Sequence, residues 1–150
     1  MGYATGVGRE APGFTIGATD GSVINLKNYR GDWFPVIVFL PAADSGAAQQ
    51  LAKLSAAALT LWGLRGQLLG VFAGSREDAW ALAEGIGDLA FPLVPDDGTV
   101  ARAYGALKES GDQRPMAFIL DRSGKIVWTG EGDEALDPDT LVAAFRSVAR

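Results

Sequence analysis

The chain has 150 residues, of which 48% are hydrophobic and 21% are charged, and its formal net charge is −5. This length and composition are typical of one soluble domain, so we expect residues 1–150 to form a single domain whose core needs no metal or disulfide. Cysteine and histidine are both absent, which excludes thiolate and imidazole chemistry and leaves Asp, Glu, Lys, Tyr, Ser and Arg for catalysis.

The acidic net charge disfavours nucleic acid or an anionic membrane as a partner. No apolar run approaches the roughly 20 residues that cross a bilayer, and the first residues lack the basic start and apolar stretch of a signal peptide. Gly85 and Gly87 lack the form of a phosphate-binding loop. We therefore expect a cytoplasmic protein with no cofactor or metal, whose partner is an unidentified protein or small molecule.

The first half of the chain predicts a hairpin, a strand and a long helix. Short β-prone runs at 14–16 and 23–26 flank Asp20-Gly21, which is a hairpin signal. The continuous apolar run 35–40 predicts a central strand buried on both faces. After a loop, apolar residues recur at helical spacing from Ala47 to about Trp62.

The second half predicts further strands and helices. Residues 68–73 form another buried run, and Ser75 with Asp78 has the form of a capping box that opens a helix through Glu84. The remaining predicted elements are an extended piece at 91–94, a short helix ending at 104, a hairpin of 116–120 and 125–129, and a last helix starting at Asp137-Pro138. Helices between the early strands imply parallel pairing, so the order predicts an α/β fold with a mixed sheet.

Several segments resemble the peroxiredoxins, the thioredoxin-fold thiol peroxidases, and are most similar to their bacterioferritin-comigratory branch. The matching segments follow the family's order over nearly all of residues 8–130, and they are 8–16, 20–31, 38–41, 91–105 and 118–126. The resemblance implies a thioredoxin-like three-layer α/β fold with a mixed central sheet and an N-terminal β-hairpin.

The family's reactive cysteine follows a Pro-x-x-x-Thr/Ser-x-x-Cys pattern at the start of the first long helix. Here Pro41 and Ser45 match the pattern, but Ala48 stands at the position of the cysteine. In the family a helix N-terminus and an arginine lower the pKa of the thiol, whose thiolate then attacks the peroxide. A methyl group cannot do this, and a resolving cysteine is also missing.

The family's arginine, three residues before the phenylalanine of the late strand, is also replaced. That position is Pro115, with Arg114 beside it. The run Pro115–Phe118 instead resembles the proline segment of the wider thioredoxin family, which is usually cis, so we predict a cis Arg114–Pro115 bond.

We therefore predict no catalytic residue and a vestigial active-site pocket. Its members are Pro41, Asp44, Ser45, Ala48, Arg114 and Pro115. Asp44 and Ser45 could orient a ligand, although a plain helix N-cap is the more usual role of such residues. Arg114 could face the pocket or equally lie in solvent or a salt bridge.

Two other groups of residues have an ordinary explanation beside a functional one. The four tryptophans could form an exposed interaction patch, but we expect most of them to be partly buried packing residues; they are Trp33, Trp62, Trp80 and Trp128. The acidic stretch could bind calcium, but it lacks the EF-hand spacing, so we expect a solvated loop; it contains Glu131, Asp133, Glu134, Asp137 and Asp139.

The leading hypothesis is a peroxiredoxin-like protein that has lost thiol chemistry and acts by binding or association, as a monomer or a homodimer. The alternative is a thiol-dependent peroxidase whose cysteine has been replaced by Ala48. A third hypothesis, catalysis by Asp, Tyr or Lys, has little support because no recognisable motif pairs two carboxylates.

Overall fold

The computed structural model describes residues 6–40, 47–87 and 89–149, with the backbone alone for Ala47 and Ala48. Near its start the chain forms the predicted hairpin. Strand β1 (Thr15–Gly17) pairs antiparallel with β2 (Val23–Asn25). A 3₁₀ helix, η1 (Leu26–Tyr29), follows directly.

The central sheet has five strands in the order β5-β4-β3-β6-β7. The strands are β3 (Phe34–Phe39), β4 (Gly66–Ala73), β5 (Leu93–Asp96), β6 (Met116–Leu120) and β7 (Ile126–Glu131). The first three run parallel, whereas β6 is antiparallel to both β3 and β7. The predicted mixed sheet is thus confirmed.

Helices connect these strands and complete the chain. They are α1 (Ala47–Gly63), α2 (Arg76–Ile86), α3 (Thr99–Ala103), α4 (Asp133–Leu136) and α5 (Pro138–Val148). The predicted caps are confirmed, because the Ser75 hydroxyl accepts a hydrogen bond from the Asp78 amide and the Asp137 carboxylate accepts one from the Thr140 amide.

The prediction of a loop through the acidic stretch is wrong in part, because residues 133–136 form the short helix α4. Ala135 and Leu136 are buried there, so this turn of helix packs two apolar side chains against the core while Asp133 and Glu134 stay at its N-terminal end.

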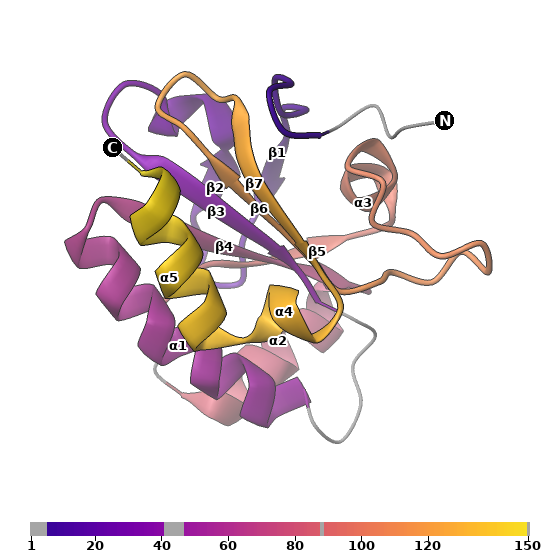
Figure 1. Ribbon diagram of the computed structural model, residues 1–150. Coiled ribbons are helices and arrows are strands. Elements are labelled where there is room, and N and C mark those ends of the chain that lie inside the picture. Colours follow the sequence, from indigo (N-terminus) through magenta and orange to yellow (C-terminus); the bar gives the residue numbers. More distant parts are fainter. Residues whose placement is uncertain (1–5, 41–46, 88, 150) are drawn as a thin grey trace.

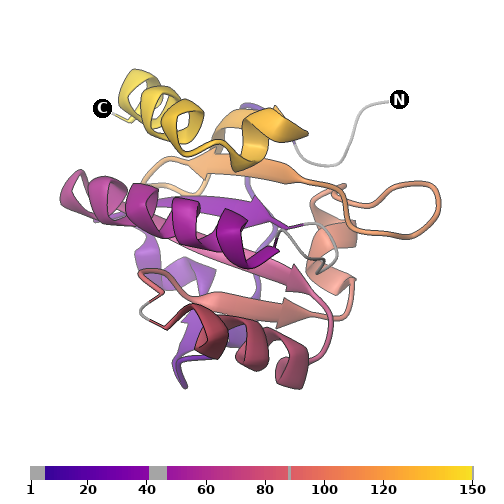
Figure 2. The same cartoon turned by 90° about the horizontal axis from the view of Figure 1, so that it is seen from below.

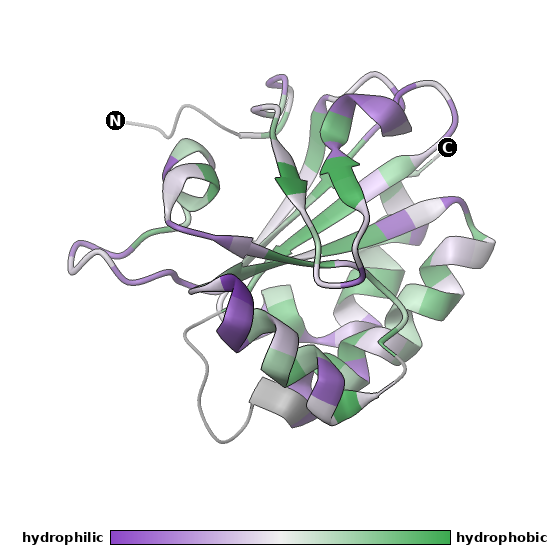
Figure 3. Ribbon diagram, turned by 180° about the vertical axis from the view of Figure 1, so that it is seen from behind, coloured by the Kyte–Doolittle hydropathy of each residue, from purple (hydrophilic) through white to green (hydrophobic). Residues whose placement is uncertain are grey.

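The elements form three layers (Figures 1 and 2). Helices α1, α2, α4 and α5 cover one face of the sheet, where Leu54, Leu61 and Phe145 belong to one hydrophobic cluster. The hairpin, η1 and α3 cover the other face, where Phe39 and Tyr104 belong to a second cluster. Figure 3 shows this second face, with the apolar hairpin lying over the apolar strands. The thioredoxin-like three-layer arrangement is as predicted.

The expectation that most tryptophans are partly buried is only half right. Trp33 and Trp128 are half-buried, but Trp62 is 60% exposed and Trp80 is 53% exposed. Both exposed residues lie on the outer sides of helices. The helical spacing of the sequence alone does not show which side of a helix faces the solvent.

Candidate functional site

The position that carries the cysteine in peroxiredoxins lies at the start of α1. Ala48 is in the first turn of this helix, where the first backbone N–H groups have no partner within the helix and the helix dipole is positive. The predicted residues Pro41, Asp44 and Ser45 lie outside the described residues. The start of α1 therefore has the electrostatics that would favour an anion, with an alanine at the position in question.

The described residues on either side of the predicted pocket lie at the same end of the sheet, where β3 ends and β6 begins. Phe39 at the end of β3 lies opposite Met116 at the start of β6. The residues that follow and precede them, Leu40 and Pro115, therefore lie at the same end of the sheet. Leu40, the last described residue before α1, thus lies at the end of the sheet where the Arg114–Pro115 segment leads into β6.

Arg114 forms a salt bridge at this edge. Its Nη2 lies 3.0 Å from Oε1 of Glu131, and its backbone N–H donates to the carbonyl of Ala106 at 2.9 Å. The structure therefore has Arg114 as a salt-bridged arginine, one of the two roles considered from the sequence.

The predicted cis bond at Pro115 is wrong. The described part of the chain contains no cis peptide bond, so the Arg114–Pro115 bond is trans. In this trans geometry the carbonyl of Pro115 accepts a hydrogen bond from Gly132 at 3.0 Å, which holds the entry to β6 against the end of β7. The resemblance to the thioredoxin proline therefore does not extend to the peptide isomer.

Sequence reasoning missed Gln113, the buried polar residue closest to this segment. The residue is 5% exposed, and its Nε2 donates to the carbonyls of Leu40 and Val71 at 2.6 and 2.9 Å. These carbonyls lie at the carboxyl ends of β3 and β4, so Gln113 ties together the two strands from which the site is built. No sequence signal marks a lone glutamine in a loop for this role.

A second contact secures the first turns of α1. Nε2 of Gln50 donates to the carbonyl of Leu136 at 2.6 Å, which ties the helix to α4. In the described residues, no group of three or more acidic side chains could hold a metal ion, and no helix there is long and apolar enough to cross a membrane.

A hollow of about 580 Å³ lies elsewhere, between β1 and α3 on the other face of the sheet. Its lining includes Phe14, Ile16, Arg76 and Asp97. Hydrogen bonds from Thr99 to the side chain of Asp97 lower the pKa of that carboxyl, because they favour its ionised form.

This chain has the thioredoxin-like architecture of peroxiredoxins, as shown by its three layers, its strand order and helix α1, which follows β3. The model of the AhpC/TSA family matches residues 7–129, and the chain belongs to this family. Alkyl hydroperoxide reductase E of Mycobacterium tuberculosis is 32% identical over 127 residues, which cover 80% of this chain and 81% of the relative.

Solved structures show the same fold. Peroxidoxin BcpB of Mycobacterium tuberculosis superposes with a TM-score of 0.84 at 20% identity, covering 97% of this chain and 99% of the other. A peroxiredoxin Q of Xanthomonas campestris has a TM-score of 0.81 at 22% identity, covering 91% and 92%. The chain therefore has the peroxiredoxin fold without any cysteine.

Proposed function

We propose that this chain is a peroxiredoxin-family protein that does not reduce peroxides and acts by binding or association. The observation that carries the proposal is Ala48, which stands in the first turn of α1 where the resemblance places the peroxidatic cysteine. With no cysteine anywhere in the 150 residues, no other thiol can take its place.

The family's reaction depends on sulfur at each step. A thiolate attacks one peroxide oxygen, the O–O bond breaks, the sulfur is oxidised to a sulfenic acid, and a thiol then reduces it. Serine and tyrosine hydroxyls are weak nucleophiles without an activating base. Met116 is buried, with 3% of the residue exposed, and methionine oxidation leaves a sulfoxide that needs a separate reductase. Turnover of peroxide therefore has no route through these side chains.

Two further departures favour lost activity over a peroxidase whose cysteine alone was replaced. Pro115 occupies the position of the family's arginine, and the resolving cysteine is absent as well. The neighbouring guanidinium of Arg114 is engaged with Glu131 at 3.0 Å. If only the reactive cysteine had been replaced by alanine, the family's arginine and a resolving cysteine would still be present.

We propose that the vestigial pocket, formed by Pro41, Asp44, Ser45, Ala48, Arg114 and Pro115, is one place where a small molecule or protein would bind. Two features support this. The Arg114–Pro115 segment lies beside the end of β3, at one end of the sheet. Helix α1 begins at this end of the sheet, so the positive end of its dipole is directed there. Such an end favours an anionic group, but the carboxylate of Asp44 would itself occupy part of it and weaken the binding of an anion.

The test is peroxide consumption by the full chain with dithiothreitol or thioredoxin as the reductant. We expect no thiol-dependent loss of hydrogen peroxide above the rate without protein. A thiol-dependent rate that scales with protein concentration would overturn the proposal.

A further inference from the structure

An apolar surface lies at the C-terminal end of α1, away from the predicted pocket. Leu59, Trp62 and Leu64 are 67%, 60% and 41% exposed. The indole of Trp33 packs against that of Trp62, with ring centroids 5.7 Å apart. We call Trp33, Leu59, Trp62 and Leu64 the docking face. Large side chains gathered in this way on a soluble protein mark interaction sites more often than isolated exposed residues do.

The solvent side of α1 has an unusual composition around this face. Of its 17 residues, Lys53 is the one that carries a charge. The outer side of a surface helix is ordinarily rich in charged residues. Among the described side chains of α1, the exposed positions are instead Gln49, Ala52, Lys53, Ala56, Leu59, Thr60, Trp62 and Gly63.

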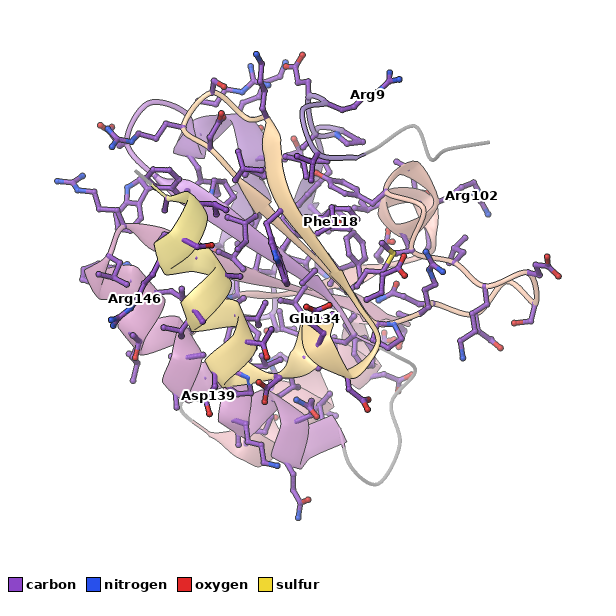
Figure 4. The ribbon with its side chains drawn as sticks, viewed as in Figure 1. Arg9, Arg102, Phe118, Glu134, Asp139 and Arg146 are labelled. Carbon is purple, nitrogen blue, oxygen red and sulfur yellow. The ribbon has the colours of Figure 1, made fainter. Side chains whose placement is uncertain are left out.

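A groove adjoins the docking face where α5 lies beside α1. It has a volume of about 410 Å³, and small or apolar side chains such as Ala56, Ala57 and Val142 contribute to its lining. Arg146 and Asp139 also line it, and Figure 4 shows the Arg146 side chain extending from α5 toward α1. Arg146 on α5 thus lies beside α1, the helix that carries the exposed Leu59 and Trp62.

Basic residues outnumber acidic ones around the face, whereas acidic residues outnumber basic ones in the whole chain. The chain has 13 basic and 18 acidic residues. Three arginines lie around the face. Arg65 follows Leu64 in the sequence, and the guanidinium of Arg122 lies 5.1 Å from the centroid of the Phe34 ring. Phe145, which precedes Arg146 in α5, packs against the same ring. Asp32 precedes Trp33, and Asp139 lines the groove with Arg146, so two aspartates accompany these three arginines. A partner that is both apolar and acidic would complement this surface.

Other occupants fit less well. The three exposed residues offer on the order of 300 Å² of apolar surface, against about 800 Å² per partner in a stable interface, so a second copy is disfavoured. An extended anionic membrane would meet the net charge of −5 over a wide area, and stable attachment usually needs a larger cluster of basic residues than these three arginines.

We propose that the docking face binds a short acidic segment of another protein, with one or two large apolar side chains of that segment seated beside Trp62 and its carboxylates near the arginines. This inference does not depend on the proposed function. Trp62 lies roughly 20 Å from Ala48 along the axis of α1, at 1.5 Å per residue. Peroxide assays test one claim and peptide binding tests the other.

The experiment selects peptides that bind the full chain from a random peptide library and then compares their affinities for the wild type and the Trp62→Ala variant. We expect peptides rich in Asp and Glu that contain Trp, Phe or Leu. Their affinity should fall at least about tenfold in Trp62→Ala and weaken with rising salt. The matched control is Trp80→Ala, which removes an equally exposed tryptophan from α2, outside the face, and should leave the affinity unchanged.

Far-UV circular dichroism confirms that both variants are folded. The proposal is overturned if no selected peptide depends on Trp62, or if the dependent peptides are basic. It is also overturned if Trp62→Ala abolishes a dimer seen by ultracentrifugation, or binding to phosphatidylserine vesicles, in place of peptide binding. In those two cases the occupant would be a second copy or a lipid surface.

Discussion

The side-chain amide of Gln113 donates to the backbone carbonyl of Leu40 at 2.6 Å, joining the loop before β6 to the end of β3. The same nitrogen lies 2.9 Å from the carbonyl oxygen of Val71, which also accepts the backbone N–H of Leu40 at 3.0 Å. One buried amide group thus links the ends of the parallel strands β3 and β4, beside the predicted pocket.

Replacing Gln113 by leucine should destabilise the protein by about 2 kcal/mol, because buried carbonyls would lose a hydrogen-bond donor that no water replaces. Urea unfolding measures the change. The control is Gln49→Leu, at an exposed position on α1, which should change the free energy of unfolding by less than about 0.5 kcal/mol. Equal stability of the two variants would show that the Gln113 contacts contribute nothing.

Gly66 and Gly63 form a second matched pair. A Cβ on Gly66 would lie 2.7 Å from Cε1 of Phe145 and 3.2 Å from the backbone oxygen of Leu61. We therefore expect Gly66→Ala to lower the free energy of unfolding by about 1–3 kcal/mol through overpacking. A Cβ on Gly63 meets nothing within 4 Å, so Gly63→Ala should be neutral or slightly stabilising. Thermal unfolding distinguishes the two, and a stable Gly66→Ala variant would contradict this packing.

Asp137 should make the stability of the protein depend on acid pH. Hydrogen bonds from the side chain and backbone of Thr140 lower the pKa of this carboxyl below its ordinary value. The unfolded state therefore takes up the proton first, so the stabilisation is present above about pH 4 and is lost as the pH falls through the lowered pKa of the folded state.

The variant Asp137→Asn tests this, because asparagine also caps helices but does not titrate. Urea unfolding at pH 7 and pH 3 should show a smaller loss of stability on acidification for the variant than for the wild type. An identical loss in both proteins would mean that the cap does not favour the ionised carboxylate.

A cysteine introduced at position 48 should be more acidic than an ordinary thiol. The first turn of α1 offers unpaired N–H groups and the positive end of the helix dipole, so Ala48→Cys should have a thiol pKa below about 8.5. The matched control is Ala52→Cys, one turn further along and exposed, with an ordinary pKa. The rate of alkylation by iodoacetamide as a function of pH gives both values, and equal pKa values would show that the start of α1 no longer activates a thiol.

Most of the fold could be predicted from the sequence because its signals are local. Asp20-Gly21 between β-prone runs indicated the hairpin, the apolar run ending at Leu40 indicated β3, and Ser75 indicated the start of α2. Helix α4 was missed because its acidic residues suggest solvent, whereas Ala135 and Leu136 alone are too few to show a helical period.

The site could be predicted only where it follows a sequence motif. Ala48 was placed at the start of α1 by the family's pattern of residues, and the structure has it in the first turn. Gln113 depends on two carbonyls from strands far away in the chain, which no local pattern indicates. The exposure of Trp62 likewise depends on which side of α1 the sheet covers.

The peroxiredoxin scaffold is present here without a cysteine, and the initial rate of hydrogen peroxide loss measures whether it can still reduce peroxide. With dithiothreitol in excess, the rate should not change as the concentration of the chain is raised. A rate that rises in proportion to the protein and vanishes without the thiol would show instead that the chain is a thiol peroxidase.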